Sequence, residues 1–124
     1  MFGIGVDIVS IERIEKSLQK ESFLRRVFGG EEIALFVTEN KIKVNSLAAN
    51  FAAKEAFSKA LGTGVRGFDF DEVQILRDNL GAPYFVFSGR AAELVNSKNL
   101  QFKVSLSHEK DTAIAFVVAQ QKSL

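Results

Sequence analysis

Two carboxylates stand in apolar surroundings in this chain, and they are its best candidates for chemistry. Asp7 interrupts an Ile- and Val-rich run that opens the protein. Glu55 lies in the middle of an alanine- and phenylalanine-rich segment, four residues before Lys59. A buried carboxylate is costly unless it is paired, hydrogen-bonded or bound to a cation, so each acid needs a partner. One or two carboxylates acting together with substrate phosphates are the usual protein ligands of Mg²⁺.

Each acid also has a purely structural interpretation. Asp7 is placed to cap the helix expected after the first strand. Glu55 is placed to form an i,i+4 ion pair with Lys59, which on an exposed helix is worth about a few tenths of a kcal/mol. Because most positions around Glu55 are Ala or Phe, we expect the pair at a buried edge, where an acid and a base together suit a metal-bound phosphate. The residues alone leave these interpretations open.

Three further features have both a functional and a structural interpretation. Gly62-Thr63-Gly64 can present backbone N–H groups to an anion, but a simple helix C-cap explains the glycines as well. His108 ends an alternating strand on the same face as Leu106, which favours a core or rim histidine over a ligand. A cluster of basic residues is typical of solvated helix faces, or of a patch that steers an acidic protein partner. The cluster consists of Arg13, Lys16, Lys20, Arg25 and Arg26.

Apolar periodicity predicts the elements that position these residues. The pattern indicates a first strand over 1–9, with Asp7 or Ser10 capping the next helix, and a long central helix over 45–61 that Gly62 ends. The remaining predicted elements are helices over about 11–19, 23–28, 31–36 and 91–95, a hairpin of 72–76 with 84–87, and strands over 102–108 and 112–119. The last strand is apolar throughout, so we expect it to be buried on both sides.

Composition narrows the class of protein. A length of 124 residues predicts one domain, 1–124, that is small for an enzyme enclosing its substrate unaided. We therefore expect a neighbouring subunit to complete the site. Sixteen Lys+Arg against fifteen Asp+Glu leave no general drive toward nucleic acid or membrane. The chain has no cysteine, which excludes disulfides and thiolate metal sites, and its opening apolar run has the features of neither a signal peptide nor a membrane span. We expect a cytoplasmic protein.

Four ordered motifs resemble the holo-(acyl carrier protein) synthases, the short 4′-phosphopantetheinyl transferases of bacterial fatty-acid synthesis. The motifs are GIGVDI at 3–8, FAAKEAFSKALGTG at 51–64, GAPY at 81–84 and SLSH at 105–108. Together they span nearly the whole chain. The resemblance implies an α+β fold with a small antiparallel sheet packed on a long central helix. It also implies a homotrimer with coenzyme A bound between adjacent subunits.

The resemblance also implies a reaction and a role for each residue. A serine of an apo acyl carrier protein attacks the β-phosphate of coenzyme A, takes the phosphopantetheine and releases adenosine 3′,5′-bisphosphate. Asp7 and Glu55 are implied as the Mg²⁺ ligands, and Lys59 as a catalytic group against the pyrophosphate. The residues implied near coenzyme A are Lys59, Gly62, Thr63, Gly64, Pro83 and His108. The residues implied to dock the acidic carrier protein are Arg13, Lys20, Arg25 and Arg26.

One position departs from the family pattern, and two other functions fit the same residues. Many relatives have arginine where this chain has Asn50, which predicts a weaker hold on the phosphates of coenzyme A, with Lys41 and Lys43 as candidates to compensate. A Mg²⁺-dependent phosphohydrolase would use two acids and a lysine on a nucleotide without a protein acceptor. A non-catalytic trimer that only binds an acidic carrier protein is the third alternative, and the retention of both acids and Lys59 argues against it.

Overall fold

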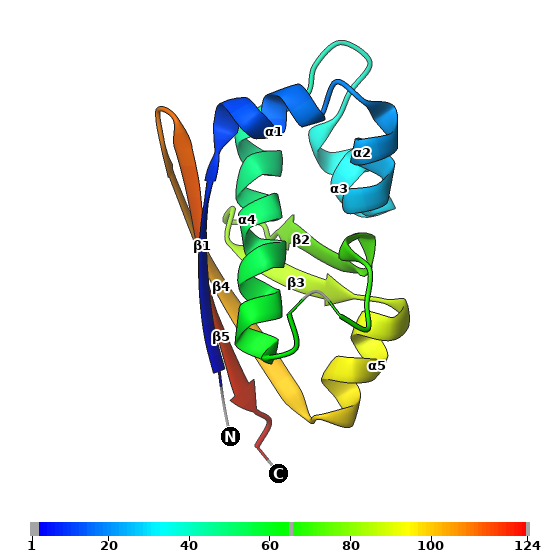
Figure 1. The fold of residues 1–124 in the computed structure, drawn as a ribbon, viewed down its shortest axis with the longest axis vertical. Coiled ribbons are helices and arrows are strands. Elements are labelled where there is room, and N and C mark those ends of the chain that lie inside the picture. The colour runs from blue at the N-terminus through cyan, green and yellow to red at the C-terminus, as the bar shows by residue number, and fades with distance from the viewer. Residues whose placement is uncertain (1–2, 65, 124) are drawn as a thin grey trace.

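The structure, a computed structural model, describes residues 3–64 and 66–123 (Figure 1). The five strands are β1 (Gly3–Ser10), β2 (Val73–Arg77), β3 (Pro83–Phe87), β4 (Leu100–Glu109) and β5 (Thr112–Gln121). The helices are α1 (Ile11–Ser17), α2 (Glu21–Val27), α3 (Gly30–Phe36), α4 (Val44–Leu61) and α5 (Gly89–Ser97), with a short 3₁₀ helix at Phe70–Glu72. The α+β class expected from the sequence is confirmed.

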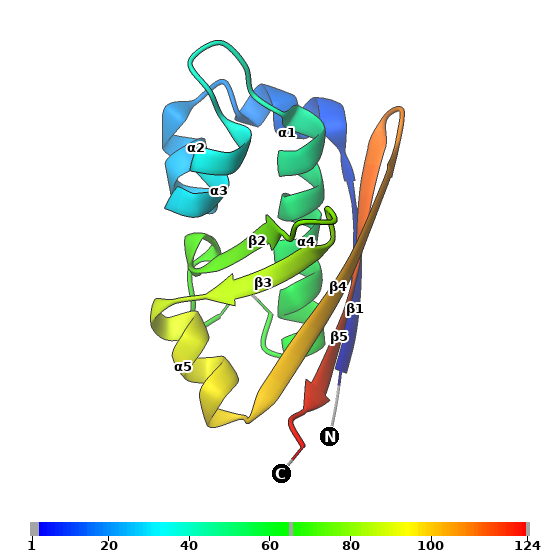
Figure 2. The same ribbon diagram turned by 180° about the vertical axis from the view of Figure 1, so that it is seen from behind.

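The strands form two separate antiparallel sheets. The larger has the order β1-β5-β4, and the smaller is the β2–β3 hairpin. Helix α4 lies along one face of the larger sheet, in contact with β1 and β5, and the hairpin packs on another side of the same helix (Figures 1 and 2). The expected arrangement of a small sheet on a long central helix is therefore confirmed.

Small residues allow the sheet and α4 to approach closely. The alanines of α4 that face the sheet are fully or almost fully buried, as are Ala113, Ala115 and Ala119 of β5. The two approach closely at β1, where a Cβ on Gly3 would lie 2.1 Å from the Ala60 carbonyl oxygen. No side chain fits there, so the glycines of the first motif set the distance between β1 and α4.

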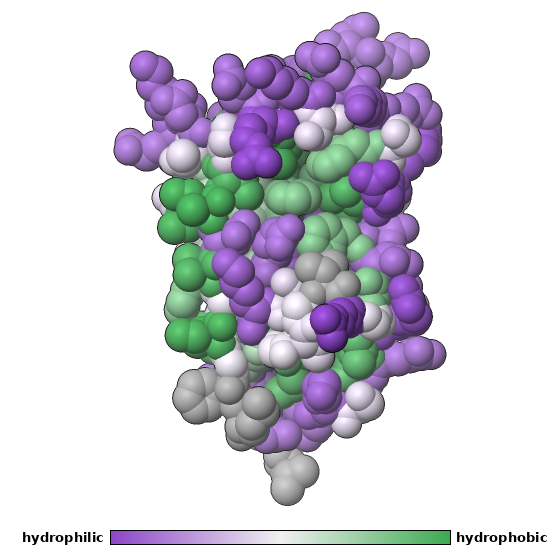
Figure 3. All heavy atoms as spheres, in the orientation of Figure 1, coloured by the Kyte–Doolittle hydropathy of each residue, from purple (hydrophilic) through white to green (hydrophobic). Residues whose placement is uncertain are grey.

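The expectation that β5 is buried on both sides is wrong for the single chain. Along β5, buried small residues alternate with Ile114 and Phe116, which are 38% and 45% exposed. Ile4, Val6 and Ile8 of β1 lie on the same open face. Figure 3 shows this apolar strip at the edge of the molecule where β1 lies. The continuous apolar run hides an alternation in which the larger residues point away from α4.

The other element predictions agree with the structure to within a few residues. Ser10, not Asp7, caps α1, because its Oγ accepts a hydrogen bond from the Arg13 N–H at 3.3 Å. Gly62 ends α4 with a φ of +86°, the left-handed cap that the sequence predicts. The start of the predicted first strand, at positions 1 and 2, lies outside the described residues. Among the helices of the described part, none is long and apolar enough to cross a membrane.

Candidate active site

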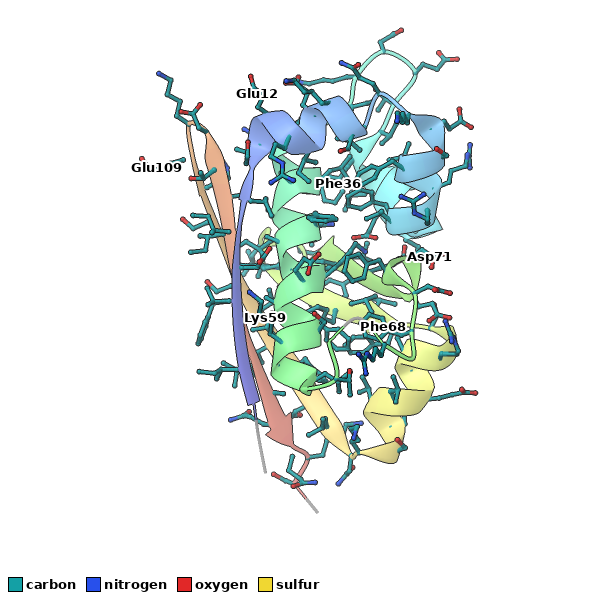
Figure 4. The ribbon with its side chains drawn as sticks, viewed as in Figure 1. Glu12, Phe36, Lys59, Phe68, Asp71 and Glu109 are labelled. Atoms are coloured by element: carbon teal, nitrogen blue, oxygen red, sulfur yellow. The ribbon has the colours of Figure 1, made fainter. Side chains whose placement is uncertain are left out.

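An acid from β1 and a base from α4 meet at the centre of the candidate site. The Lys59 Nζ lies 3.3 Å from the Asp7 Oδ1 and donates a hydrogen bond to the Val6 carbonyl at 2.9 Å. Figure 4 shows Lys59 where α4 runs alongside β1. The Asp7 side chain is 19% exposed and that of Lys59 is 54% exposed. The pair therefore lies at a half-buried edge that a ligand can reach.

Glu55 belongs to the same cluster of charges. Burial raises the pKa of the Glu55 carboxyl above its ordinary value of 4.5, the negative charge of Asp7 raises it further, and Lys59 opposes both effects. The two carboxylates are thus within electrostatic reach of each other. Glu55 lies one turn of α4 before Lys59. The cluster holds two acids and one base, so it attracts a further cation.

The structural interpretations of the two acids do not hold in this geometry. Asp7 does not cap α1, because Ser10 does so. The ion pair of Lys59 among the described residues runs to Asp7 on β1, and not to Glu55 on its own helix. Asp7 and Glu55 are therefore two half-buried acids close to each other. A cation-binding function requires such an arrangement.

The donor chemistry of this site fits a hard divalent cation. Asp7 and Glu55 offer carboxylate oxygens, the ligands that Mg²⁺ prefers. In the described part of the chain, no third Asp, Glu, His or Cys joins them in a group that could hold a metal. The remaining ligands would have to be water and substrate oxygens, which is how Mg²⁺ is usually held at phosphate-processing sites.

The loop after α4 starts one turn beyond Lys59. The Gly62 N–H donates to the carbonyls of Ser58 and Lys59, both at 3.2 Å, so it closes the helix. The Thr63 hydroxyl donates to the Gly64 carbonyl at 3.0 Å. For Gly62 the C-cap interpretation is therefore the correct one, and its N–H is not available to an anion. The roles of Thr63 and Gly64 toward coenzyme A stay predictions.

Pro83 and His108 are not brought to this site within one chain. Pro83 begins β3 and pairs with Arg77, on the separate hairpin. His108 lies on β4 in the same row of the sheet as Ala113 and Val9, two strands away from β1, or roughly 10 Å at the usual strand spacing. It is exposed and lies next to the end of β4, where the β4–β5 hairpin splays away from α4 (Figure 1). The core interpretation of His108 is wrong.

The basic residues lie on α1 and α2, and one of them, Lys20, is the N-cap residue of α2. Lys16, Lys20 and Arg26 line a hollow of about 490 Å³. Arg13 lines a second hollow of about 310 Å³, which also includes the end of β1 beyond Asp7. Both hollows include Phe23, so they adjoin. Of the four predicted docking residues, Arg25 differs in being paired with the exposed Glu21 at 2.9 Å. Lys16 belongs to the basic cluster of the sequence but not to the implied docking residues, and it lines this hollow as well.

A buried polar network behind Glu55 was not predicted from the sequence. Lys54 and Glu32 are completely buried and form an ion pair of 2.7 Å. Lys54 also donates to the carbonyls of Phe70 and Val73, and Asn50 donates to the second carboxylate oxygen of Glu32 at 2.8 Å. The signal in the sequence is Lys54, a lysine among the alanines of the central helix. It indicates a buried acid partner, but not which one.

Asn50 has a structural role in this network. Its side chain is completely buried, and its amide oxygen accepts a hydrogen bond from Arg77 Nη2 at 2.9 Å. Its amide nitrogen also donates to the Ile75 carbonyl at 2.9 Å. The side chain has no exposed surface in the single chain, so Asn50 offers nothing to a ligand there. A weaker hold on coenzyme A in the absence of an arginine stays a prediction, as does compensation by Lys41 and Lys43.

Comparison with known proteins decides the family. The family model of the 4′-phosphopantetheinyl transferase superfamily matches residues 3–117. The chain belongs to this superfamily. A holo-[acyl-carrier-protein] synthase of Clostridium beijerinckii is 44% identical to it over 121 residues, which cover 97% of this chain and 98% of the relative.

Solved structures of this superfamily share the fold. The crystal structure of a holo-[acyl-carrier-protein] synthase from Neisseria meningitidis matches with a TM-score of 0.88 and 40% identity, over 98% of this chain and 100% of that one. The Helicobacter pylori synthase in complex with coenzyme A matches with a TM-score of 0.80 and 37% identity, over 94% of this chain and 99% of that one. The family and the fold that the motifs implied are confirmed.

Proposed function

We propose that this phosphopantetheinyl transferase is a Mg²⁺-dependent holo-(acyl carrier protein) synthase. It would transfer 4′-phosphopantetheine from coenzyme A to a serine of an apo acyl carrier protein. The observation that carries the proposal is the contact of Asp7 on β1 with Lys59 on α4, close to Glu55. The fold that holds these residues is shared with relatives named holo-[acyl-carrier-protein] synthase. Fatty-acid biosynthesis and a cytoplasmic location go with this pair of substrates.

Each residue of the cluster would have its own role in phosphoryl transfer. The serine oxygen forms a bond to the β-phosphorus of coenzyme A, the bond to the bridging oxygen breaks, and adenosine 3′,5′-bisphosphate leaves. Asp7 and Glu55 would hold Mg²⁺, which when bound offsets negative charge on the phosphates. The Lys59 ammonium would bind a pyrophosphate oxygen. A water molecule, or one of the two carboxylates acting through it, would take the serine proton.

We propose a homotrimer in which adjacent subunits complete each site. The apolar strip of β1 and β5 supports this assembly, because a protein rarely leaves so many large apolar side chains on one open face. The positions of Pro83 and His108 also support it, since both lie away from Asp7 within one chain. A neighbouring subunit would bring these two residues to the coenzyme A bound at Lys59.

The basic surface of α1 and α2 is the proposed docking site for the carrier protein. Acyl carrier proteins are acidic, and the hollow lined by Lys16, Lys20 and Arg26 offers three cations with no acid among its lining residues. The adjoining hollow with Arg13 leads to the end of β1. A carrier bound here would present its serine toward Asp7. Charge complementarity of this kind steers association and sets orientation.

One reaction tests the proposal against its alternatives. The protein is incubated with coenzyme A, Mg²⁺ and an apo acyl carrier protein, and the carrier is weighed by mass spectrometry. We expect a gain of one phosphopantetheine that a chelator abolishes. Nucleotide released without modification of the carrier would indicate a phosphohydrolase instead. A carrier that binds but stays unmodified across several acceptors would indicate a binding module.

A further inference from the structure

Lys59 places a positive charge against one acid of the pair, Asp7. Its ammonium is 3.3 Å from Asp7 and is also held by the Val6 carbonyl at 2.9 Å, so two oxygen atoms of β1 bind it. Its charge also opposes the rise in the pKa of Glu55. A lysine in the last turn of a helix often serves the helix dipole, but this one reaches sideways to a neighbouring strand.

We propose that the Lys59 ammonium is an internal stand-in for the divalent cation, and that it must leave Asp7 before a metal can bind there. The ammonium lies 3.3 Å from Asp7, so a divalent cation bound by Asp7 and Glu55 would lie within a few ångströms of it. Positive charges that close to each other repel strongly. The Lys59 side chain is more than half exposed, so nothing blocks its movement into solvent once its contacts with β1 are given up. The inference rests on the metal site proposed above.

The displaced ammonium links metal binding to coenzyme A binding. In the metal-free protein, release of Lys59 gives up an ion pair and a hydrogen bond. A bound pyrophosphate supplies a new anionic partner for the same ammonium. Each ligand therefore favours the same displaced position of Lys59, and each should strengthen the binding of the other by the same factor. Metal alone would bind weakly, and the complete site would assemble with both ligands together.

Metal titration of lysine variants tests this inference without measuring catalysis. Mn²⁺ is used as the probe, because carboxylate and water ligands suit it as they suit Mg²⁺, and free Mn²⁺ is followed by electron paramagnetic resonance. Without coenzyme A, we expect Lys59→Met to bind Mn²⁺ at least about fivefold more tightly than the wild type, the lower end of typical coupling between sites. Lys59→Arg keeps the charge and should bind Mn²⁺ as the wild type does.

A second titration, with saturating coenzyme A, measures the coupling. We expect coenzyme A to tighten Mn²⁺ binding to the wild type by a larger factor than to Lys59→Met, after correction for Mn²⁺ bound by coenzyme A alone. Lys98→Met is the matched control, because it removes the same charge from an exposed position at the end of α5. This control should leave both titrations unchanged.

The outcomes separate this inference from the proposed function. If the wild type binds Mn²⁺ and Lys59→Met binds it equally or more weakly without coenzyme A, the stand-in role is overturned while the metal site remains. If neither protein binds Mn²⁺ under either condition, both proposals are overturned. Circular dichroism of each variant checks the fold, which the partly exposed Lys59 position should not disturb.

Discussion

Gly5 of β1 faces the backbone of Ala56 on α4 so closely that a Cβ on the glycine would lie 2.0 Å from the Ala56 carbonyl oxygen. Asp7 is two residues further along the same strand, and Glu55 directly precedes Ala56. The distance between these two backbones therefore decides the distance between the two acids. No flexible side chain can move aside at this contact, because the obstructing atoms belong to the backbone.

We predict that Gly5→Ala lowers both stability and transferase activity. The added methyl group must push β1 away from α4, and overpacking of this kind costs about 1–3 kcal/mol of unfolding free energy. Urea denaturation measures that loss, and the carrier assay measures activity on the protein that remains folded. Gly30→Ala is the matched control, since a Cβ at Gly30 has no neighbour within 4 Å. Equal behaviour of the two variants would contradict the close-contact argument.

We predict that Asp7→Asn or Glu55→Gln lowers the transfer rate by at least about a hundredfold, the scale of losing one strong electrostatic contributor to a transition state. Both substitutions keep the shape of the side chain and remove its charge. The side chains are only partly buried, so circular dichroism should be unchanged. The rate is measured at ordinary Mg²⁺ with coenzyme A saturating. A variant that kept most of its activity would show that the metal assignment is wrong.

We predict that Lys54→Met destabilises the protein by about 3–5 kcal/mol, because it leaves Glu32 charged in the core without its ammonium partner. The double variant Glu32→Gln with Lys54→Met removes both charges and should regain a large part of the loss. Urea unfolding of Lys54→Met, of Glu32→Gln and of the double variant gives the coupling energy between the two residues. A double variant no more stable than Lys54→Met alone would refute this account of the network.

The sequence predicts a helix or strand well where its apolar residues follow a single periodicity. The pattern predicts the central helix over 45–61, and α4 runs over Val44–Leu61, since its alanines and Gly62 agree on both limits. For β5 the apolar run predicts burial on both sides. In the structure the small residues face α4 and the large ones, such as Phe116, face outward. Residue types do not reveal which apolar face of the strand stays open in the single chain.

The candidate site is predictable in its acids and not in its contacts. Asp7 and Glu55 are noticeable because acids are unusual among apolar neighbours. The contact of Asp7 with Lys59 depends on how far β1 lies along α4, which is a long-range register set by backbone packing. The partner of the buried Lys54 is Glu32, 22 residues away. Local patterns carry no information on such pairs.

We predict a pH effect on stability that depends on Glu55. Burial and the charge of Asp7 raise its pKa in the folded protein above the ordinary 4.5. Between these two values the folded protein binds more protons than the unfolded chain, so the unfolding free energy falls as the pH rises through this range. Glu55→Gln removes the effect, so it should gain stability relative to the wild type above the range and not below it.

Urea denaturation of both proteins across this pH range, with a chelator present, measures the difference. The chelator matters because a bound cation would stabilise the charged form of Glu55 and hide the effect. A difference between the two proteins that stays constant with pH would contradict the raised pKa. Glu21→Gln serves as the control, since Glu21 is an exposed acid in α2 and its pair with Arg25 is at the surface.

We predict that Arg26→Glu raises the KM for the carrier protein about tenfold or more and leaves the KM for coenzyme A unchanged. Arg26 lines the basic hollow with Lys16 and Lys20, so an acid there would repel an acidic partner. Arg25→Glu is the comparison on the same helix. Because Arg25 is already paired with Glu21, less of its charge is available to a partner, and its reversal should have a smaller effect. The difference between the two variants should shrink as salt is added, because screening weakens exposed charges. Equal effects of both reversals at low salt would show that total charge, and not the hollow of α1 and α2, selects the carrier.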